Sequence, residues 1–260
     1  DLPVWYKENA GAVLSTTINK YCYIFCRNLP PFFEHKHRIV WSKIEAVKKI
    51  SEIEHPAVKA ILKTMSINDG IEIHHVGDLP AKSGLGSSSS FTVGLLNAVY
   101  GLKSIMPTKL QLATQAIHIE RDILKENVGS QDQVSAAFGG FNKISFNDKN
   151  KIDIQPIIMN PKRLKNLQNH FLLYFTGQTR IASEIAKIQI ENTPTKKREL
   201  ILMSQMVDEA IKILTQNKNL TDFGKLLHET WMIKRSLSDK ITKPEIDNIY
   251  ESAHKAGGIG

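Results

Sequence analysis

The feature that most constrains the fold is a glycine- and serine-rich loop that lies between a strand pattern and a helix pattern. Residues 70–76, GIEIHHV, alternate as a half-buried strand does. Residues 91–99 instead place apolar side chains at the spacing of one helix face. The loop ends in four serines, 87–90, and serine is favoured at the start of a helix rather than in its middle. The segment therefore predicts a strand, a loop and a helix in succession.

A helix start of this kind is suited to an anion. Its first N–H groups have no acceptor within the helix and lie at the positive end of the helix dipole, so phosphate is a natural partner. Glycine at 84 and 86 would let the backbone approach a phosphate and would tolerate positive φ. The alternative, a flexible connector, is less favoured, because connectors rarely join a periodic strand to a periodic helix. The candidate phosphate-binding residues are Lys82, Gly84, Leu85, Gly86, Ser87, Ser88 and Ser89.

Charge and hydropathy limit the classes of molecule that the protein is expected to bind. The net charge is +8 and the pI about 9.3, which favours anionic partners of many kinds. The densest basic groups, 162–165 and 196–198, contain no interleaved aromatic residues, so we interpret them as solvated faces and expect no nucleic-acid partner. No apolar run reaches the roughly 18 residues of a membrane helix, and we expect no membrane partner.

The cysteines indicate the redox compartment. There are two, Cys22 and Cys26, in an alternating segment that predicts a strand. Both would point to one face, too far apart along the strand to form a disulfide. Reduced thiols, and an N-terminal stretch without the pattern of a secretory signal, predict a cytoplasmic protein.

The first half of the chain mixes strands with helices, whereas the second half is mainly helical. Expected strands are 13–25, 38–41, 70–76 and 170–175, with a hairpin over 141–157 that turns at 147–150. Expected helices are 45–53, 55–65, the helix that begins at the serines, 109–126, 181–192, 197–216, 220–237 and 243–256. The character changes between 148 and 165, so we expect an N-terminal domain over 1–155 and a C-terminal domain over 156–260.

Two acids follow the phosphate loop at a spacing that suits catalysis. Glu120 lies on the helix expected over 109–126, and Asp132 follows in a turn, 127–133, where Gly129 lets the chain reverse. Mg²⁺ prefers carboxylate and hydroxyl oxygens and takes few protein ligands. A second carboxylate could then accept the proton of an acceptor hydroxyl. On spacing alone, two solvated surface acids remain the alternative.

Two motifs carry a family resemblance. The segment DLPAKSGLGSSSS resembles the ATP-binding motif of the GHMP kinases, and GSQDQVSAAFGG resembles their catalytic-acid segment. Within that superfamily the chain is most similar to the D-glycero-D-manno-heptose 7-phosphate kinases. Stretches that carry this similarity span nearly the whole chain and include VWSKIEAV, IEHPAVKAIL, LLYFTGQTR and LLHETWMIKRSLS.

The resemblance implies a two-domain α+β fold with ATP and Mg²⁺ as cofactors. It implies that the amides of 84–89 hold the ATP phosphates, that Ser88 and Glu120 ligate Mg²⁺, and that Asp132 accepts the proton of the sugar hydroxyl. On the substrate side it implies Asp1, Asp132, Gly177 and Arg180, although for Arg180 a structural ion pair is an equal alternative.

The implied activity is phosphorylation of the anomeric hydroxyl of a heptose 7-phosphate, so a small sugar phosphate is the expected partner. Three alternatives stay open: a kinase for another sugar such as fucose or galactose, a nucleotide- or sugar-binding sensor on the same scaffold, and a nucleic-acid binder. The family's N-terminal basic stretch and C-terminal glycine-rich motif would lie outside 1–260, so we expect an incomplete chain. The oligomeric state is not predicted.

Overall fold

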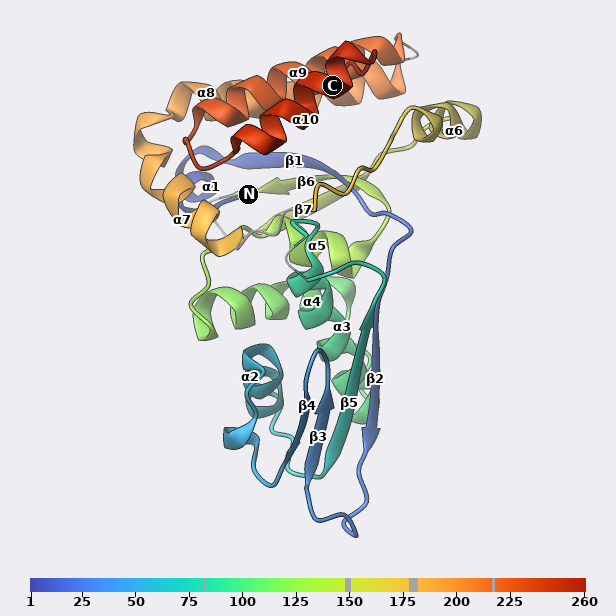
Figure 1. The fold of residues 1–260 in the computed structure, drawn as a ribbon, viewed down its shortest axis with the longest axis vertical. Helices are drawn as coiled ribbons and strands as arrows, with labels where there is room; N and C mark the ends of the chain where they lie inside the picture. The colour runs from blue at the N-terminus through green and yellow to red at the C-terminus, as the bar shows by residue number, and fades with distance from the viewer. Residues whose placement is uncertain (82, 148–150, 178–181, 217) are drawn as a thin grey trace. The chain divides into compact units, whose positions relative to one another are not determined.

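The computed structural model describes residues 1–81, 83–147, 151–177, 182–216 and 218–260, which form two compact units (Figure 1). One unit holds Thr17–Gly139. The other holds Asp1–Thr16, a segment that begins at Gly140, and Ser183–Gly260. Each unit combines helices with one sheet, which confirms the predicted α+β class. The units follow contacts rather than family boundaries, so domains over 1–155 and 156–260 stay a prediction.

The Thr17–Gly139 unit is built on a four-stranded sheet in the order β2-β5-β3-β4. Strand β5 runs antiparallel to β2 and parallel to β3, and β3 and β4 form an antiparallel pair. Cys22 and Cys26 are both free and lie on the same face of β2, as predicted. The strands are β2 (Cys22–Asn28), β3 (His37–Val40), β4 (Ile44–Val47) and β5 (Ile71–Gly77).

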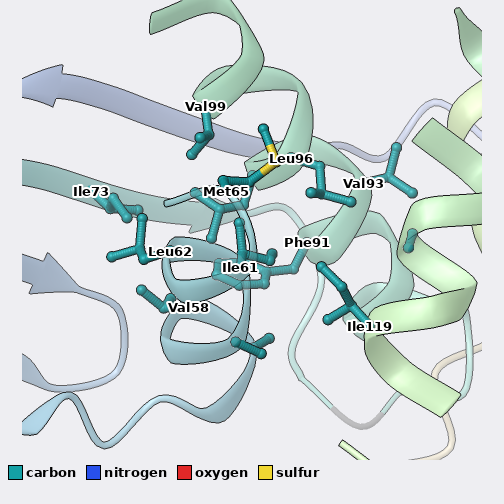
Figure 2. Packing of buried hydrophobic residues seen from close by; sticks show 14 of the residues in the cluster. Val58, Ile61, Leu62, Met65, Ile73, Phe91, Val93, Leu96, Val99 and Ile119 are labelled. Carbon is teal, nitrogen blue, oxygen red and sulfur yellow. The ribbon is translucent and has the colours of Figure 1, made fainter. Parts of the chain in front are cut away.

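Helices cover one face of this sheet and enclose the core of the unit. Apolar side chains of α2 pack toward α3 and toward Ile73 of β5 (Figure 2). Burying each of these side chains stabilises the fold by roughly 1.5–3 kcal/mol. Pro56 stands in the first turn of α2, as predicted, where its missing N–H costs nothing. The helices are α2 (Pro56–Thr64), α3 (Ser87–Leu102), α4 (Lys109–Ile117) and α5 (Gln131–Phe138), with a 3-10 turn η1 (Ile50–Glu52) and a π-helix η2 (His118–Ile123).

An ion-pair cluster lies on the opposite face of the same sheet. Glu72 alternates with the core residues Ile71 and Ile73 along β5, and its side chain is only 4% exposed. Its carboxylate accepts hydrogen bonds from Arg27 at 2.5 Å and from Arg38 at 2.7 Å. Arg27 comes from β2 and Arg38 from β3, so one carboxylate ties three adjacent strands together.

Two predictions in this part of the chain are wrong. The helix expected over 45–53 is instead strand β4 followed by η1, because β4 gains its backbone partners by pairing with β3. Glu45, which would have been solvated on a helix, is buried and accepts a hydrogen bond from Trp41 Nε1. The single strand expected over 13–25 is divided into β1 and β2, which pair in different sheets.

The other unit contains a three-stranded antiparallel sheet in the order β1-β6-β7. Helix α8 packs on β1, and α9 packs on α8 (Figure 1). The strands are β1 (Gly11–Thr16), β6 (Phe141–Phe146) and β7 (Ile152–Pro156). The helices are α1 (Pro3–Asn9), α6 (Pro161–Asn169), α7 (Ala182–Asn192), α8 (Lys197–Thr215), α9 (Leu220–Ser236) and α10 (Pro244–Lys255), with a 3-10 turn η3 (Thr193–Thr195).

The second half of the chain is mainly helical, as predicted, with one exception. The hairpin expected over 141–157 is confirmed by β6 and β7, although part of its turn, 148–150, lies outside the described residues. The buried strand expected over 170–175 is wrong: 171–175 is not a strand, and its side chains are at least 55% exposed. A strand needs backbone hydrogen bonds to a neighbouring strand, and none of the described strands pairs with 171–175.

Among the described residues, no helix combines the length and the apolar character needed to cross a membrane.

Candidate active site

The predicted strand, loop and helix are confirmed as β5, the loop after Gly77, and α3. Gly84 has φ +78° and Gly86, the residue that precedes the helix, has φ +70°, a conformation that favours glycine. The first hydrogen bond at the start of α3 runs from the N–H of Ser90 to the carbonyl of Gly86. The N–H groups at 87–89 precede this bond, at the positions where a helix itself supplies no acceptor, and the first turn contains no acid.

Glu120 reaches the first turn of α3 from the π-helix η2. Its side chain is 1% exposed, and its Oε2 accepts a hydrogen bond from the Ser89 hydroxyl at 2.9 Å. The same oxygen accepts a hydrogen bond from Gln133 Nε2 at 2.5 Å. A π-helix adds a residue to one turn and often marks a functional site, and here the turn carries the most buried acid of the unit.

Burial dominates the electrostatics of Glu120. It raises the pKa of the carboxyl group because the charged form loses its hydration, whereas the nearby Thr92 hydroxyl and the hydrogen bonds from Gln133 and Ser89 favour the charged form and lower the pKa. The negative charge of Asp132 adds a smaller upward shift of the pKa. The net shift of the pKa is upward, and a cation beside Glu120 would favour the ionised form.

Asp132 lies in the first turn of α5 and faces the phosphate loop. The sequence predicts it in a turn that extends to 133, and this is wrong because α5 already begins at Gln131. A Cβ placed on Gly86 would lie 3.2 Å from Cγ of Asp132 and 3.3 Å from its Oδ2. Three segments, the start of α3, η2 and the start of α5, therefore bring Gly86, Ser89, Glu120 and Asp132 together.

The other predicted site residues lie outside this group of four residues. Ser88 is exposed on the first turn of α3, next to Ser89, and its carbonyl accepts a hydrogen bond from Thr92. Asp1 and Gly177 belong to the other compact unit, where Gly177 is exposed with φ +71°. Lys82 and Arg180 lie outside the described residues. Leu85 lies in the loop and is 48% exposed, and Ser87 is the first residue of α3.

Sequence reasoning missed Ser89 as a partner of Glu120, and it missed Gln133 and Thr92 altogether. The available signal was weak: Gln133 directly follows the candidate acid Asp132, and Ser89 is one of four similar serines. Only the folded chain shows which hydroxyl and which amide reach the carboxylate.

The residues present fit a magnesium ion. Glu120 Oε1 is buried and has no hydrogen-bond partner among the described residues, so this oxygen is available to a cation. Oxygen donors are the ligands that Mg²⁺ prefers, and the nearby N–H groups at the start of α3 suit the phosphates that usually supply its remaining ligands.

Comparison with known proteins agrees with this geometry. Residues 47–140 match the sequence profile of the GHMP kinases N terminal domain. A D-glycero-alpha-D-manno-heptose 7-phosphate kinase of Campylobacter jejuni is 33% identical over 189 residues, which are 70% of this chain and 54% of that protein. A galactokinase of Clostridium perfringens is 25% identical over 241 residues, which are 78% of this chain and 61% of that protein.

A solved structure shares the fold. A D-glycero-D-manno-heptose 1-phosphate kinase from Bacteroides thetaiotaomicron superposes with a TM-score of 0.71 at 24% identity, over 87% of this chain and 71% of that one. The present chain spans only about half the length (54%) of the heptose kinase from Campylobacter jejuni. The sequence match and the shared fold confirm the resemblance that the two motifs indicate.

Proposed function

From the premise that residues 47–140 form a GHMP kinase N-terminal domain, we propose that the protein is an ATP- and Mg²⁺-dependent sugar kinase. Its proposed substrate is D-glycero-D-manno-heptose 7-phosphate, and the product is the 1,7-bisphosphate. The observation that carries the proposal is the convergence of Glu120 and Asp132 on the glycine-flanked start of α3. The substrate assignment is supported by the 33% identity to the heptose kinase of Campylobacter jejuni.

The loop and the start of α3 bind the phosphates of ATP in this proposal. The amides of 84–89 would donate hydrogen bonds, and the helix dipole would favour the negative charge. Lys82 would add a positive charge to the same loop. Because the helix α3 fixes the direction of the N–H groups at its start before ATP arrives, these groups need no reorganisation as charge develops on the transferred phosphate.

Ser88 and Glu120 would hold Mg²⁺. When bound, the ion would neutralise charge on the phosphate oxygens. The contribution of the chain is to present two oxygen donors from different elements, the first turn of α3 and the π-helix η2. Asp1, Gly177 and Arg180 remain proposed substrate contacts on the sugar side.

Asp132 would accept the proton of the acceptor hydroxyl. The hydroxyl oxygen forms a bond to the γ-phosphorus, and the bond from that phosphorus to the β–γ bridging oxygen breaks, so that ADP leaves. The hydroxyl proton passes to the Asp132 carboxylate. The short distance between the Asp132 carboxylate and the position that a Cβ of Gly86 would take supports this role, because the carboxylate lies beside the loop that would carry the γ-phosphate.

Replacement of Asp132 tests the proposal. Asp132→Asn keeps the shape but removes the proton acceptor, so kcat should fall by roughly 10²–10⁴ while ATP still binds. Asp122→Asn is the matched control, because Asp122 is an exposed acid on the π-helix η2 that pairs with His118 of the same helix. Unchanged turnover in Asp132→Asn would overturn the assignment.

The competing substrates and classes are separated by an ATP-consumption screen. Consumption only with heptose 7-phosphate supports the proposal, whereas consumption with galactose or fucose supports the alternative suggested by the galactokinase match. ATP binding without consumption on any sugar would favour a sensor. Both cysteines are free, in keeping with the cytoplasmic location that we also propose.

A further inference from the structure

The two oxygens of the Glu120 carboxylate have very different surroundings. Oε2 accepts two hydrogen bonds, from Ser89 at 2.9 Å and from Gln133 at 2.5 Å. Oε1 is buried and has no hydrogen-bond partner among the described residues. One oxygen is thus fixed by the protein and the other is left open.

A buried carboxylate oxygen without a hydrogen-bond donor destabilises the folded protein unless a bound ion or molecule interacts with it. A buried acceptor without a donor gives up its hydrogen bonds to water without replacement, and a charged acceptor loses more than a neutral one. The amide oxygen of Gln133 is in the same condition, since it is buried and has no hydrogen-bond partner in the described part of the chain. Glu120 and Gln133, which contact each other, therefore each have one buried oxygen without a hydrogen-bond donor among the described residues. A cation, or a water molecule bound to a cation, would satisfy both oxygens.

The orientation of Gln133 follows from this contact. Its NH₂ group faces Oε2 of Glu120, because turning the amide over would bring its oxygen against that acceptor oxygen. The side chain is 1% exposed, so packing fixes its position. Ser89 is 5% exposed and equally constrained.

We infer that Gln133 and Ser89 are positioning residues that hold Oε2 of Glu120 so that Oε1 faces the magnesium ion. The inference rests on the proposed function and goes beyond it. Gln133 follows Asp132 directly on α5, and Ser89 follows Ser88 on α3. The two hydrogen bonds therefore tie the position of the metal-binding carboxylate to the segments that carry the proposed base and the second proposed ligand.

The test measures Mg²⁺ affinity directly, apart from turnover. Mg²⁺ is titrated by calorimetry into the purified protein saturated with a non-hydrolysable ATP analogue. Groups that orient a metal ligand typically change affinity by about 10–100-fold, and we expect a weakening in that range for Gln133→Met, which keeps the length but loses the donor. Ser89→Ala, a smaller change, should also weaken Mg²⁺ binding, and high Mg²⁺ should restore much of kcat in both variants.

Matched controls separate positioning from structure. Gln115→Met makes the same change at an amide elsewhere in the unit, which bonds to Met65 and Tyr100. Ser90→Ala makes the serine change one residue further along α3. A merely structural role would lower stability in the Gln115 and Gln133 variants alike and leave Mg²⁺ affinity unchanged in both.

Two results would overturn the inference, and they are distinguishable. If Glu120→Gln loses Mg²⁺ binding while Gln133→Met and Ser89→Ala both stay within about twofold of wild type, the positioning role is refuted and the proposed kinase stands. If the wild-type protein binds no Mg²⁺ with nucleotide and transfers no phosphate, the proposed function fails together with the inference.

Discussion

Alanine substitution at Gly84 and Gly86 separates backbone strain from contact with the proposed base. Both glycines have positive φ, +78° and +70°, so an alanine at either position pays roughly 1–2 kcal/mol for the left-handed conformation. That loss lowers the ratio of folded to unfolded protein by about 5–30-fold. On backbone grounds alone, Gly84→Ala and Gly86→Ala should be destabilised by similar amounts.

The two variants differ in what the added methyl group meets. A Cβ at Gly84 has nothing within 4 Å, whereas a Cβ at Gly86 lies 3.2 Å from Cγ of Asp132. The Asp132 carboxylate must therefore move by a few tenths of an ångström in Gly86→Ala. Since a misplacement of about 1 Å can cost roughly 100-fold in rate, we expect kcat at saturating ATP to fall about tenfold more in Gly86→Ala than in Gly84→Ala.

Urea unfolding and steady-state kinetics on the same preparations measure the two effects. The expected result is a similar free energy of unfolding for both variants and a lower kcat for Gly86→Ala. Equal kcat values in the two variants would refute the contact between Asp132 and the loop as a determinant of rate. A wild-type free energy of unfolding in Gly86→Ala would refute the strain argument.

Two further predictions concern groups outside the site. Hydrogen bonds from His74, Arg27 and Arg38 lower the pKa of Glu72 to about 2, below the ordinary value of 4.5, despite the opposing effect of burial. The stability that Glu72 contributes is therefore complete above pH 4.5 and is lost as the pH falls toward 2. Between pH 5 and pH 3, the free energy of unfolding in urea should change less in Glu72→Gln than in the wild-type protein. An identical change in the two proteins would contradict this reasoning. Burial raises the pKa of the Cys26 thiol to about 12. At pH 8 this thiol should therefore react with a disulfide reagent far more slowly in the native protein than in the unfolded chain. Equal rates would show that the thiol is not buried.

Local features of the fold could be predicted from the sequence. The strand, loop and helix around 77–87 depend on alternation, glycine and serine in neighbouring positions, and they form as predicted. The long helices of the second half show clear 3.6-residue periodicity and also form. By contrast, β4 forms by pairing with β3, whereas no described strand pairs with 171–175, and the local sequence pattern indicates neither outcome.

The candidate site, too, could be predicted from the sequence only in part. Glu120 and Asp132 could be chosen by residue type and by family resemblance. Their surroundings could not, because the contact of Ser89 with Glu120 joins residues 31 positions apart. The π-helix that carries Glu120 continues an ordinary amphipathic pattern over 109–126, so nothing in the periodicity indicates the extra residue in the turn.

The cluster around Glu72 has a consequence for how the chain finds its fold. The parallel pair of β3 and β5 cannot be aligned by a tight turn, so its alignment must be selected after the strands meet. A slip by one residue would turn Glu72 into the hydrocarbon interior and leave both guanidinium groups without their acceptor. A mispaired register would thus be unstable enough to dissociate and pair again. Glu72 therefore helps to select the correct register during folding, and it also stabilises the folded sheet.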